Sequence, residues 1–107
     1  MPPIRILVAE DETRYLRSLA AALRRLGHGI QTICVSNDRE LLEHLADPTK
    51  PHYDCVVLDY ALGDTPAREL LPRIAHLTRS PVLVCSSSAD QFVVIDCLRA
   101  GATDFIP

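Results

Sequence analysis

The sequence predicts an α/β protein, a doubly wound five-stranded parallel sheet with helices packed on its faces. Strand-like and helix-like segments alternate along the 107 residues with short connections, which is typical of βαβ units. The strand-like segments are short runs dense in Val, Ile and Leu without polar alternation, as expected for strands covered on both faces. A chain of this length is predicted to form one domain with a modest core.

The first predicted elements are a strand, an amphipathic helix and a second strand. The apolar run 6–9 predicts the first strand. Apolar residues then recur at helical spacing, with arginines between them, which predicts a helix over about residues 12–26 that Gly27 ends. The apolar run 30–35 predicts the second strand.

The next segment contains the second helix and the third strand. Asn37, with Glu40 three positions later, resembles a capping box and predicts the start of the second helix. Pro48 and Pro51 indicate a loop after this helix. The apolar run 55–58 predicts the third strand.

The third helix is predicted to follow a loop over residues 60–65. We expect Thr65 to be the N-cap and Pro66 to occupy the first helical position, because both residue types are favoured there. The helix is expected to run to about Leu77. Pro72 conflicts with it, since an interior proline removes a hydrogen bond, so we expect either a later start or a kink.

The last predicted elements are a strand, a helix and a short strand. Residues 81–85 predict the fourth strand, and Ser88 with Gln91 resembles a second capping box. The fourth helix is expected to end at Gly101, because glycine favours a helix C-terminus. Residues 102–106 predict the fifth strand.

Carboxylates end two of the predicted strands. Glu10 and Asp11 follow the first strand, and Asp59 follows the third. If the strands are ordered 2-1-3-4-5, the first and third are neighbours about 4.8 Å apart, and these side chains converge at the switch point where such sheets bind ligands. Crowded carboxylates either share protons or hold a cation. The sequence therefore predicts a metal-bound acidic site.

The composition excludes several other classes of function. With 48% hydrophobic residues, 23% charged residues and a net charge of -3, the chain has no basic surface for nucleic acid and no membrane-binding stripe. We therefore expect no direct nucleic-acid or membrane binding by this module, and a cytoplasmic location. The cysteines show no metal-ligand spacing and are expected to be small buried apolar residues: Cys34, Cys55, Cys85 and Cys97.

Four segments together resemble the receiver domains of two-component response regulators. They are residues 6–12, the run 56–59 that ends in Asp59, residues 81–86, and residues 100–105. The resemblance covers essentially the whole chain and implies a flavodoxin-like fold with the strand order 2-1-3-4-5. It further implies a signalling switch that is controlled by phosphorylation, and which catalyses only its own phosphoryl transfer and dephosphorylation.

The resemblance also assigns roles to individual residues. Asp59 looks like the phosphoacceptor, a carboxylate nucleophile that forms an acyl phosphate. Asp11 resembles a direct Mg²⁺ ligand, with Asp59 and the backbone carbonyl of Ala61 as further ligands and Glu10 acting through water. Oxygen ligands with several waters suit Mg²⁺.

Two further residues match the family's switching positions. Ser86 resembles the hydroxyl residue that contacts the phosphoryl group, a catalytic as well as a switching role. Phe105 stands at the position of the aromatic residue that turns inward when that hydroxyl moves. Implied partners are a sensor histidine kinase or a phosphotransfer protein, and the expected output is control of transcription.

The chain departs from the family pattern in two places. Gly63 and Pro66 stand where the family usually has Pro and Gly, in the loop after Asp59. The family's lysine after the aromatic residue and its fifth helix lie beyond Pro107, so we expect an incomplete receiver domain in which apolar strand surface is exposed. We predict that the chain self-associates or folds only marginally, and sedimentation as a stable, monodisperse monomer would contradict this.

Two alternative functions remain. A receiver-like binding or dimerisation module would keep the fold without phosphotransfer, which the missing lysine allows. An aspartate-nucleophile phosphohydrolase of the dehalogenase-like type expects a second aspartate two residues after the nucleophile, where this chain has Ala61. The phosphohydrolase class is therefore disfavoured.

Overall fold

A computed structural model describes residues 3–26, 29–86 and 91–106 of the chain. Its helices are α1 (Thr13–Arg25), α2 (Asp38–Ala46), α3 (Ala67–Leu77) and α4 (Gln91–Ala100). The strands of the main sheet are β1 (Ile4–Ala9), β2 (Ile30–Val35), β3 (Cys55–Asp59), β6 (Val82–Cys85) and β7 (Asp104–Ile106). Two further strands, β4 (Ala61–Leu62) and β5 (Thr65–Pro66), lie between β3 and α3.

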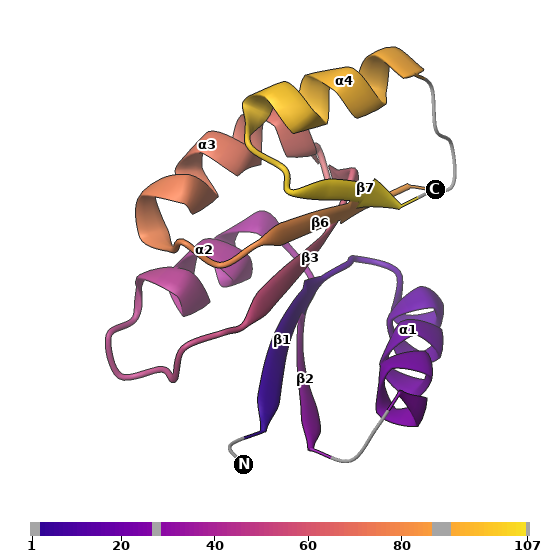
Figure 1. Ribbon diagram of the computed structural model, residues 1–107, viewed down its shortest axis with the longest axis vertical. Coiled ribbons are helices and arrows are strands. Elements are labelled where there is room, and N and C mark those ends of the chain that lie inside the picture. The colour runs from indigo at the N-terminus through magenta and orange to yellow at the C-terminus, as the bar shows by residue number, and fades with distance from the viewer. Residues whose placement is uncertain (1–2, 27–28, 87–90, 107) are drawn as a thin grey trace.

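The main sheet is parallel throughout, with the order β2-β1-β3-β6-β7. This is the predicted order 2-1-3-4-5 when its strands alone are numbered, so the predicted fold class is confirmed. Figure 1 shows α1 against one face of the sheet and α2, α3 and α4 against the other. Among the described residues, no helix has the length and apolar character needed to cross a membrane.

The core lies mainly between the sheet and the α2–α4 layer. Its fully buried side chains come from the strands and from α2, α3 and α4, because one face of the sheet packs against one apolar stripe of each of these helices. A second, smaller cluster lies between the sheet and α1, and contains Ile6, Val8, Val57 and Cys85. The main cluster contains Leu7, Leu41, Val56, Leu58, Leu62, Leu70, Leu71, Ile74, Val84 and Cys97, among others.

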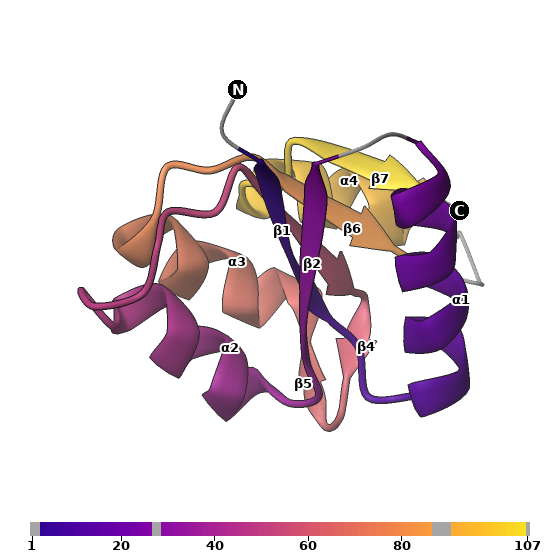
Figure 2. The same cartoon turned by 90° about the horizontal axis from the view of Figure 1, so that it is seen from below.

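The sheet face beneath α1 is less exposed than predicted. Helix α1 is the only helix of the described segments on this face (Figures 1 and 2), yet Val57 and Cys85 are each only 7% exposed. Exposed apolar surface appears at the β7 edge, where Ile106, the register partner of Cys85, is 44% exposed. Ile4, at the start of β1, is 52% exposed as well, so the large exposed apolar residues of the described strands lie at the β7 edge and at the beginning of β1.

Local capping signals in the sequence produce the expected helix ends at two positions. The side chain of Asn37 accepts a hydrogen bond of 2.8 Å from the Glu40 amide, which confirms the predicted N-cap of α2, a contact worth about 1 kcal/mol. The Glu40 side chain in turn accepts from the Ser36 amide. Gly101, with φ of 120°, follows α4 as predicted. The Gly27 stop and the Ser88 cap fall outside the described residues.

The start of α3 differs from the prediction. Pro66 is the N-cap in an extended conformation, and Thr65 lies in β5 without capping the helix. Helix α3 begins at Ala67 and carries Pro72 inside it. Of the two expected outcomes the later start is therefore wrong, and the kink at Pro72 stays a prediction. Thr65 lies one residue before the N-cap, and its hydroxyl donates a 3.1 Å hydrogen bond to Asp38 in α2.

The expectation for the cysteines holds in part. Cys85 and Cys97 are buried and Cys55 is partly buried, whereas Cys34 is exposed. Cys34 lies in β2, which is an edge strand of the sheet, and an edge strand is covered less completely than the central ones.

Candidate functional site

The three carboxylates of the predicted site meet at one edge of the sheet. Strands β1 and β3 pair in parallel with Ala9 opposite Leu58, so Glu10, which follows β1, and Asp59, which ends β3, come next at the same end of the sheet. Asp11 follows in the turn toward α1. One carboxylate oxygen from each of Glu10, Asp11 and Asp59 lies within 4.8 Å of the others. The carboxyl edge of the sheet therefore carries a compact acidic cluster.

Backbone amides hold two of these carboxylates in place. Glu10 is only 6% exposed, and its Oε1 accepts a 3.1 Å hydrogen bond from the Glu12 amide. Asp11 is exposed, and its Oδ2 accepts a 3.1 Å hydrogen bond from the amide of Gly63, which lies 52 residues away. The loop after β3 is thus fastened to the turn after β1.

The crowding perturbs the acidity of the cluster. Burial raises the pKa of Glu10 to about 7, and the charge of Asp59 and the neighbouring Asp11 add to the effect, against the opposing Glu12 amide. Burial also raises the pKa of Asp59, and the charge of Asp11 adds to this, although the amides of Ala61 and Tyr60 oppose it. Because the pKa values of Glu10 and Asp59 are raised, ionisation of all the carboxylates is unfavourable unless a positive charge lies nearby.

The donor set fits a hard divalent cation. Three carboxylates within 4.8 Å of one another supply oxygen ligands, which Mg²⁺ and similar ions prefer. Within the described part of the chain, the one recorded ion pair is Arg39–Glu43 on the surface of α2, so no described basic side chain pairs with the cluster. The acidic cluster therefore suits a metal site.

The Ala61 carbonyl is positioned by a feature that the sequence reasoning missed, the β4–β5 hairpin. The Ala67 amide donates a 2.8 Å hydrogen bond to the Tyr60 carbonyl, so Tyr60 and Ala67 form a hydrogen-bonded pair at the base of the hairpin. Along an antiparallel ladder, opposite residues alternate between hydrogen-bonded and non-hydrogen-bonded pairs, and Ala61–Pro66 is the next pair. The pair Ala61–Pro66 is therefore non-hydrogen-bonded. The amide and carbonyl of Ala61 both point away from β5, and its amide contacts Asp59.

A sequence signal for this hairpin existed. Gly63 and Asp64 form a two-residue connection of a type that favours hairpins, and Gly63 has φ of 61°, which glycine adopts without strain. Pro66 in the second strand argued against a strand there, because proline lacks an amide hydrogen. Its place in a non-hydrogen-bonded pair removes that objection.

The two predicted switching residues lie on neighbouring strands. Ser86 follows β6 directly, one residue beyond Cys85, which is the register partner of Asp59. The Ser86 amide donates a 3.1 Å hydrogen bond to the carbonyl of Ile106 in β7. Phe105 is partly buried and packs against the main core cluster. The fold thus brings Ser86 to the edge that carries Asp59, and connects it through β7 to Phe105.

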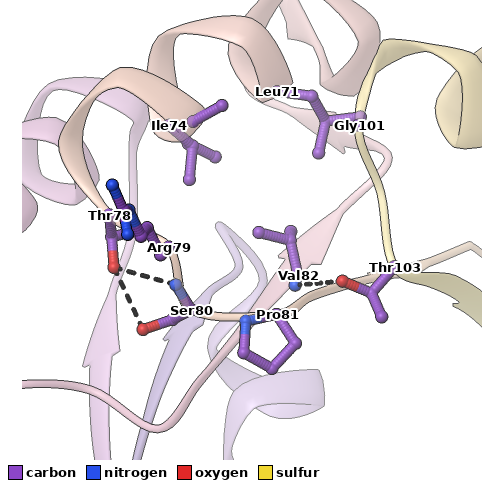
Figure 3. A pocket seen from close by; sticks show the side chains of 10 residues that line it. Leu71, Ile74, Thr78, Arg79, Ser80, Pro81, Val82, Gly101 and Thr103 are labelled. Carbon is purple, nitrogen blue, oxygen red and sulfur yellow. Dashed lines mark hydrogen bonds between the residues drawn. The ribbon is translucent and has the colours of Figure 1, made fainter.

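A cavity of about 440 Å³ lies at the opposite end of β6, between the ends of α3 and α4 (Figure 3). Its hydroxyl groups already have partners: the Thr78 hydroxyl contacts Ser80, and the Thr103 hydroxyl accepts a hydrogen bond from the Val82 amide. Because these groups are occupied with one another, the acidic cluster remains the candidate functional site.

Curated relatives resemble nearly the whole chain. The regulatory protein AtoC of Escherichia coli is 31% identical over 103 residues, which is 95% of this chain and 21% of AtoC. The KDP operon transcriptional regulatory protein KdpE of the same organism is 32% identical over 102 residues, covering 94% of this chain and 43% of KdpE. The chain thus spans less than half the length of these relatives.

Solved structures share the fold. The Mn²⁺-bound form of the response regulator Rcp1 superimposes with a TM-score of 0.86 at 22% identity, over 97% of this chain and 80% of that one. A response regulator from Burkholderia pseudomallei, solved with a phosphorylated aspartic acid and a calcium ion, gives 0.81 at 20% identity, over 96% and 58%. The HemR receiver domain of Leptospira biflexa gives 0.80 at 27% identity, over 97% and 81%.

The family model of the response regulator receiver domain matches residues 6–107. This match agrees with the parallel sheet order and with the acidic cluster at its carboxyl edge. The chain therefore belongs to the receiver domain family of two-component response regulators.

Proposed function

We propose that the chain is a phosphorylation-controlled switch in which Asp59 accepts a phosphoryl group in the presence of Mg²⁺. The observation that carries this proposal is the cluster of three carboxylates within 4.8 Å at the end of two neighbouring strands. Such a cluster suits a cation and a nucleophile together, because a divalent ion offsets the repulsion that otherwise favours protonation. Asp59 is the nucleophile in this proposal, because it ends β3, which is the middle strand of the sheet.

The proposed ligands of the cation are Asp11, Asp59 and the carbonyl of Ala61, with Glu10 acting through water. The outward direction of the Ala61 carbonyl in the hairpin supports its inclusion. When bound, Mg²⁺ supplies positive charge beside the phosphoryl oxygens. Glu10 is nearly buried and held by the Glu12 amide, and this position supports an outer role for it.

The proposed reaction is a phosphoryl transfer to the Asp59 side chain. A carboxylate oxygen of Asp59 bonds to phosphorus as the bond between phosphorus and the donor breaks, and the donor leaves with the electron pair. The amides of Tyr60 and Ala61 contact the Asp59 carboxylate and orient it. Hydrolysis of the resulting acyl phosphate by water returns the carboxylate and ends the signal.

The proposed switch runs from Ser86 to Phe105. The Ser86 hydroxyl contacts the phosphoryl group, and the residue then moves toward Asp59. Because the Ser86 amide is hydrogen-bonded to Ile106, next to Phe105, such a movement bears directly on β7. A change at Asp59 would thereby alter the surface formed by α4 and β7.

Receiver domains act with histidine kinases, and we propose a sensor histidine kinase or a phosphotransfer protein as the phosphoryl donor of this chain. The proposed output is transcription, because the curated relative KdpE is a transcriptional regulatory protein by name, while AtoC is named a regulatory protein. Both relatives are longer than the matched region, so the output of this chain remains a proposal.

Phosphorylation with a small donor tests the proposal. The chain, incubated with Mg²⁺ and acetyl phosphate, is expected to gain the mass of one phosphoryl group, as measured by intact-protein mass spectrometry. Chelation of Mg²⁺ by EDTA is expected to prevent the gain, because the cation is needed beside the phosphoryl oxygens. A chain that binds Mg²⁺ but forms no adduct would instead favour the alternative, a receiver-like binding or dimerisation module.

A further inference from the structure

The β4–β5 hairpin after Asp59 is too short to hold its own shape. Each strand has two residues, and Pro66 has no amide hydrogen to donate. Isolated two-stranded hairpins are at best marginally stable in water even when they are longer. The position of the Ala61 carbonyl, which this hairpin carries, therefore depends on contacts with the rest of the protein.

The Ala61 amide contacts Asp59, and the Ala67 amide closes the base of the hairpin on the Tyr60 carbonyl. Three further contacts fasten the hairpin. The side chain of Leu62 is 1% exposed and belongs to the main core cluster. The amide of Gly63 donates to Asp11, which belongs to the acidic cluster itself. On the second strand, the Thr65 hydroxyl donates a 3.1 Å hydrogen bond to the Asp38 carboxylate. Figure 2 shows the hairpin at the end of the sheet where β1 leads into α1.

The contact with Asp38 joins the hairpin to a helix, whereas the other two contacts join it to the core and to the acidic cluster. Asp38 is the first residue of α2, and 27 residues separate it from Thr65. Both side chains are partly buried, so solvent competes less for this hydrogen bond than for an exposed one. The first strand of the hairpin is held by the core and the acidic cluster. The second strand leads into the buried Ala67 of α3, and its side-chain hydrogen bond is with α2.

We propose that the Thr65–Asp38 hydrogen bond positions the β4–β5 hairpin for cation binding, so that Thr65 is a positioning residue for the acidic site. The inference rests on the proposed Mg²⁺ site. Without the bond, β5 loses its contact with α2, and the paired strand that presents the Ala61 carbonyl is held less firmly. Cation affinity then falls, because ordering the hairpin becomes part of binding.

The test compares the Mg²⁺ affinity of the whole chain and its variants by isothermal titration calorimetry, without any phosphoryl donor. Thr65→Val keeps the shape of the side chain and removes the hydroxyl, and it is expected to weaken Mg²⁺ binding about five-fold, the equivalent of one ordinary hydrogen bond. Thr65→Ser keeps the hydroxyl and is expected to restore the affinity of the parent chain.

A matched control exists at the other end of α2. The Thr49 hydroxyl donates a 2.7 Å hydrogen bond to Asp47, another threonine–aspartate contact, but far along the helix from the hairpin. Thr49→Val is expected to leave the Mg²⁺ affinity unchanged. In an Asp38→Ala background, Thr65→Val is expected to have no additional effect, because the acceptor is already gone.

The outcomes separate this inference from the proposed function. If the parent binds Mg²⁺ and Thr65→Val binds it equally well, the inference is overturned while the proposed function stands. Equal weakening by Thr65→Ser and Thr65→Val would also overturn it, because the hydroxyl would then not be the cause. A parent chain that binds no Mg²⁺ would contradict the proposed function and this inference together.

Discussion

Asp59→Asn is expected to form no phosphoryl adduct with acetyl phosphate and Mg²⁺. The amide has nearly the shape of the carboxylate and can still accept from the Tyr60 and Ala61 amides, but its oxygen is a poor nucleophile. Intact-protein mass spectrometry of the parent and the variant under the same conditions measures the effect. The loss of the adduct is expected to be complete, because no other carboxylate of the cluster lies at the end of β3, the middle strand of the sheet.

The same variant is expected to be more stable than the parent in the absence of a cation. Burial and the charge of Asp11 raise the pKa of Asp59, so its ionised form weakens the folded state at neutral pH. Chemical denaturation in EDTA measures this gain. Asp64→Asn in the hairpin turn is the matched control, and it is expected to keep the adduct. A residual adduct in Asp59→Asn would mean that another residue accepts the phosphoryl group.

The stability of the cation-free chain is expected to fall as the pH rises from 4.5 to about 7. The folded state holds the Glu10 proton with a pKa of about 7, against 4.5 for the unconstrained side chain. Between these values the folded chain binds more protons than the unfolded chain, so the contribution of Glu10 is fully present below pH 4.5 and is lost above 7. The free energy of unfolding is expected to fall by about 3 kcal/mol over this pH range.

Urea denaturation in EDTA across this pH range, on the parent and on Glu10→Gln, measures the effect. The free energy of unfolding of Glu10→Gln is expected to increase relative to that of the parent as the pH rises, because glutamine does not ionise. Glu69→Gln, an exposed position in the first turn of α3, is the matched control and is expected to follow the parent. Added Mg²⁺ is expected to flatten the pH dependence. A constant difference between Glu10→Gln and the parent would contradict this account.

Much of the fold could be predicted because its signals are local. Apolar runs without polar alternation identified the buried parallel strands, and Asn37 identified the start of α2, since a cap depends on residues within one helical turn. The convergence of Glu10 and Asp59 also followed from the sequence, because parallel strands end at the same edge once their order is known.

The loop after Asp59 could not be predicted in the same way. Thr65 and Pro66 suit a helix start by local preference, yet they form β5, which pairs with β4 while the Thr65 hydroxyl contacts Asp38. The position of Pro66 in a non-hydrogen-bonded pair likewise depends on the register of the hairpin. Local preference was overruled by contacts between residues that are distant in the chain.

The sequence by itself determined the class of fold and the edge of the sheet where the carboxylates gather. The tertiary structure alone decided how deeply Glu10 is buried, that the Gly63 amide contacts Asp11, and that Thr65 contacts Asp38. The physical reason is one of range. Periodicity and capping act within a few residues, whereas burial and these hydrogen bonds join segments 27 and 52 residues apart, which only the folded chain brings together.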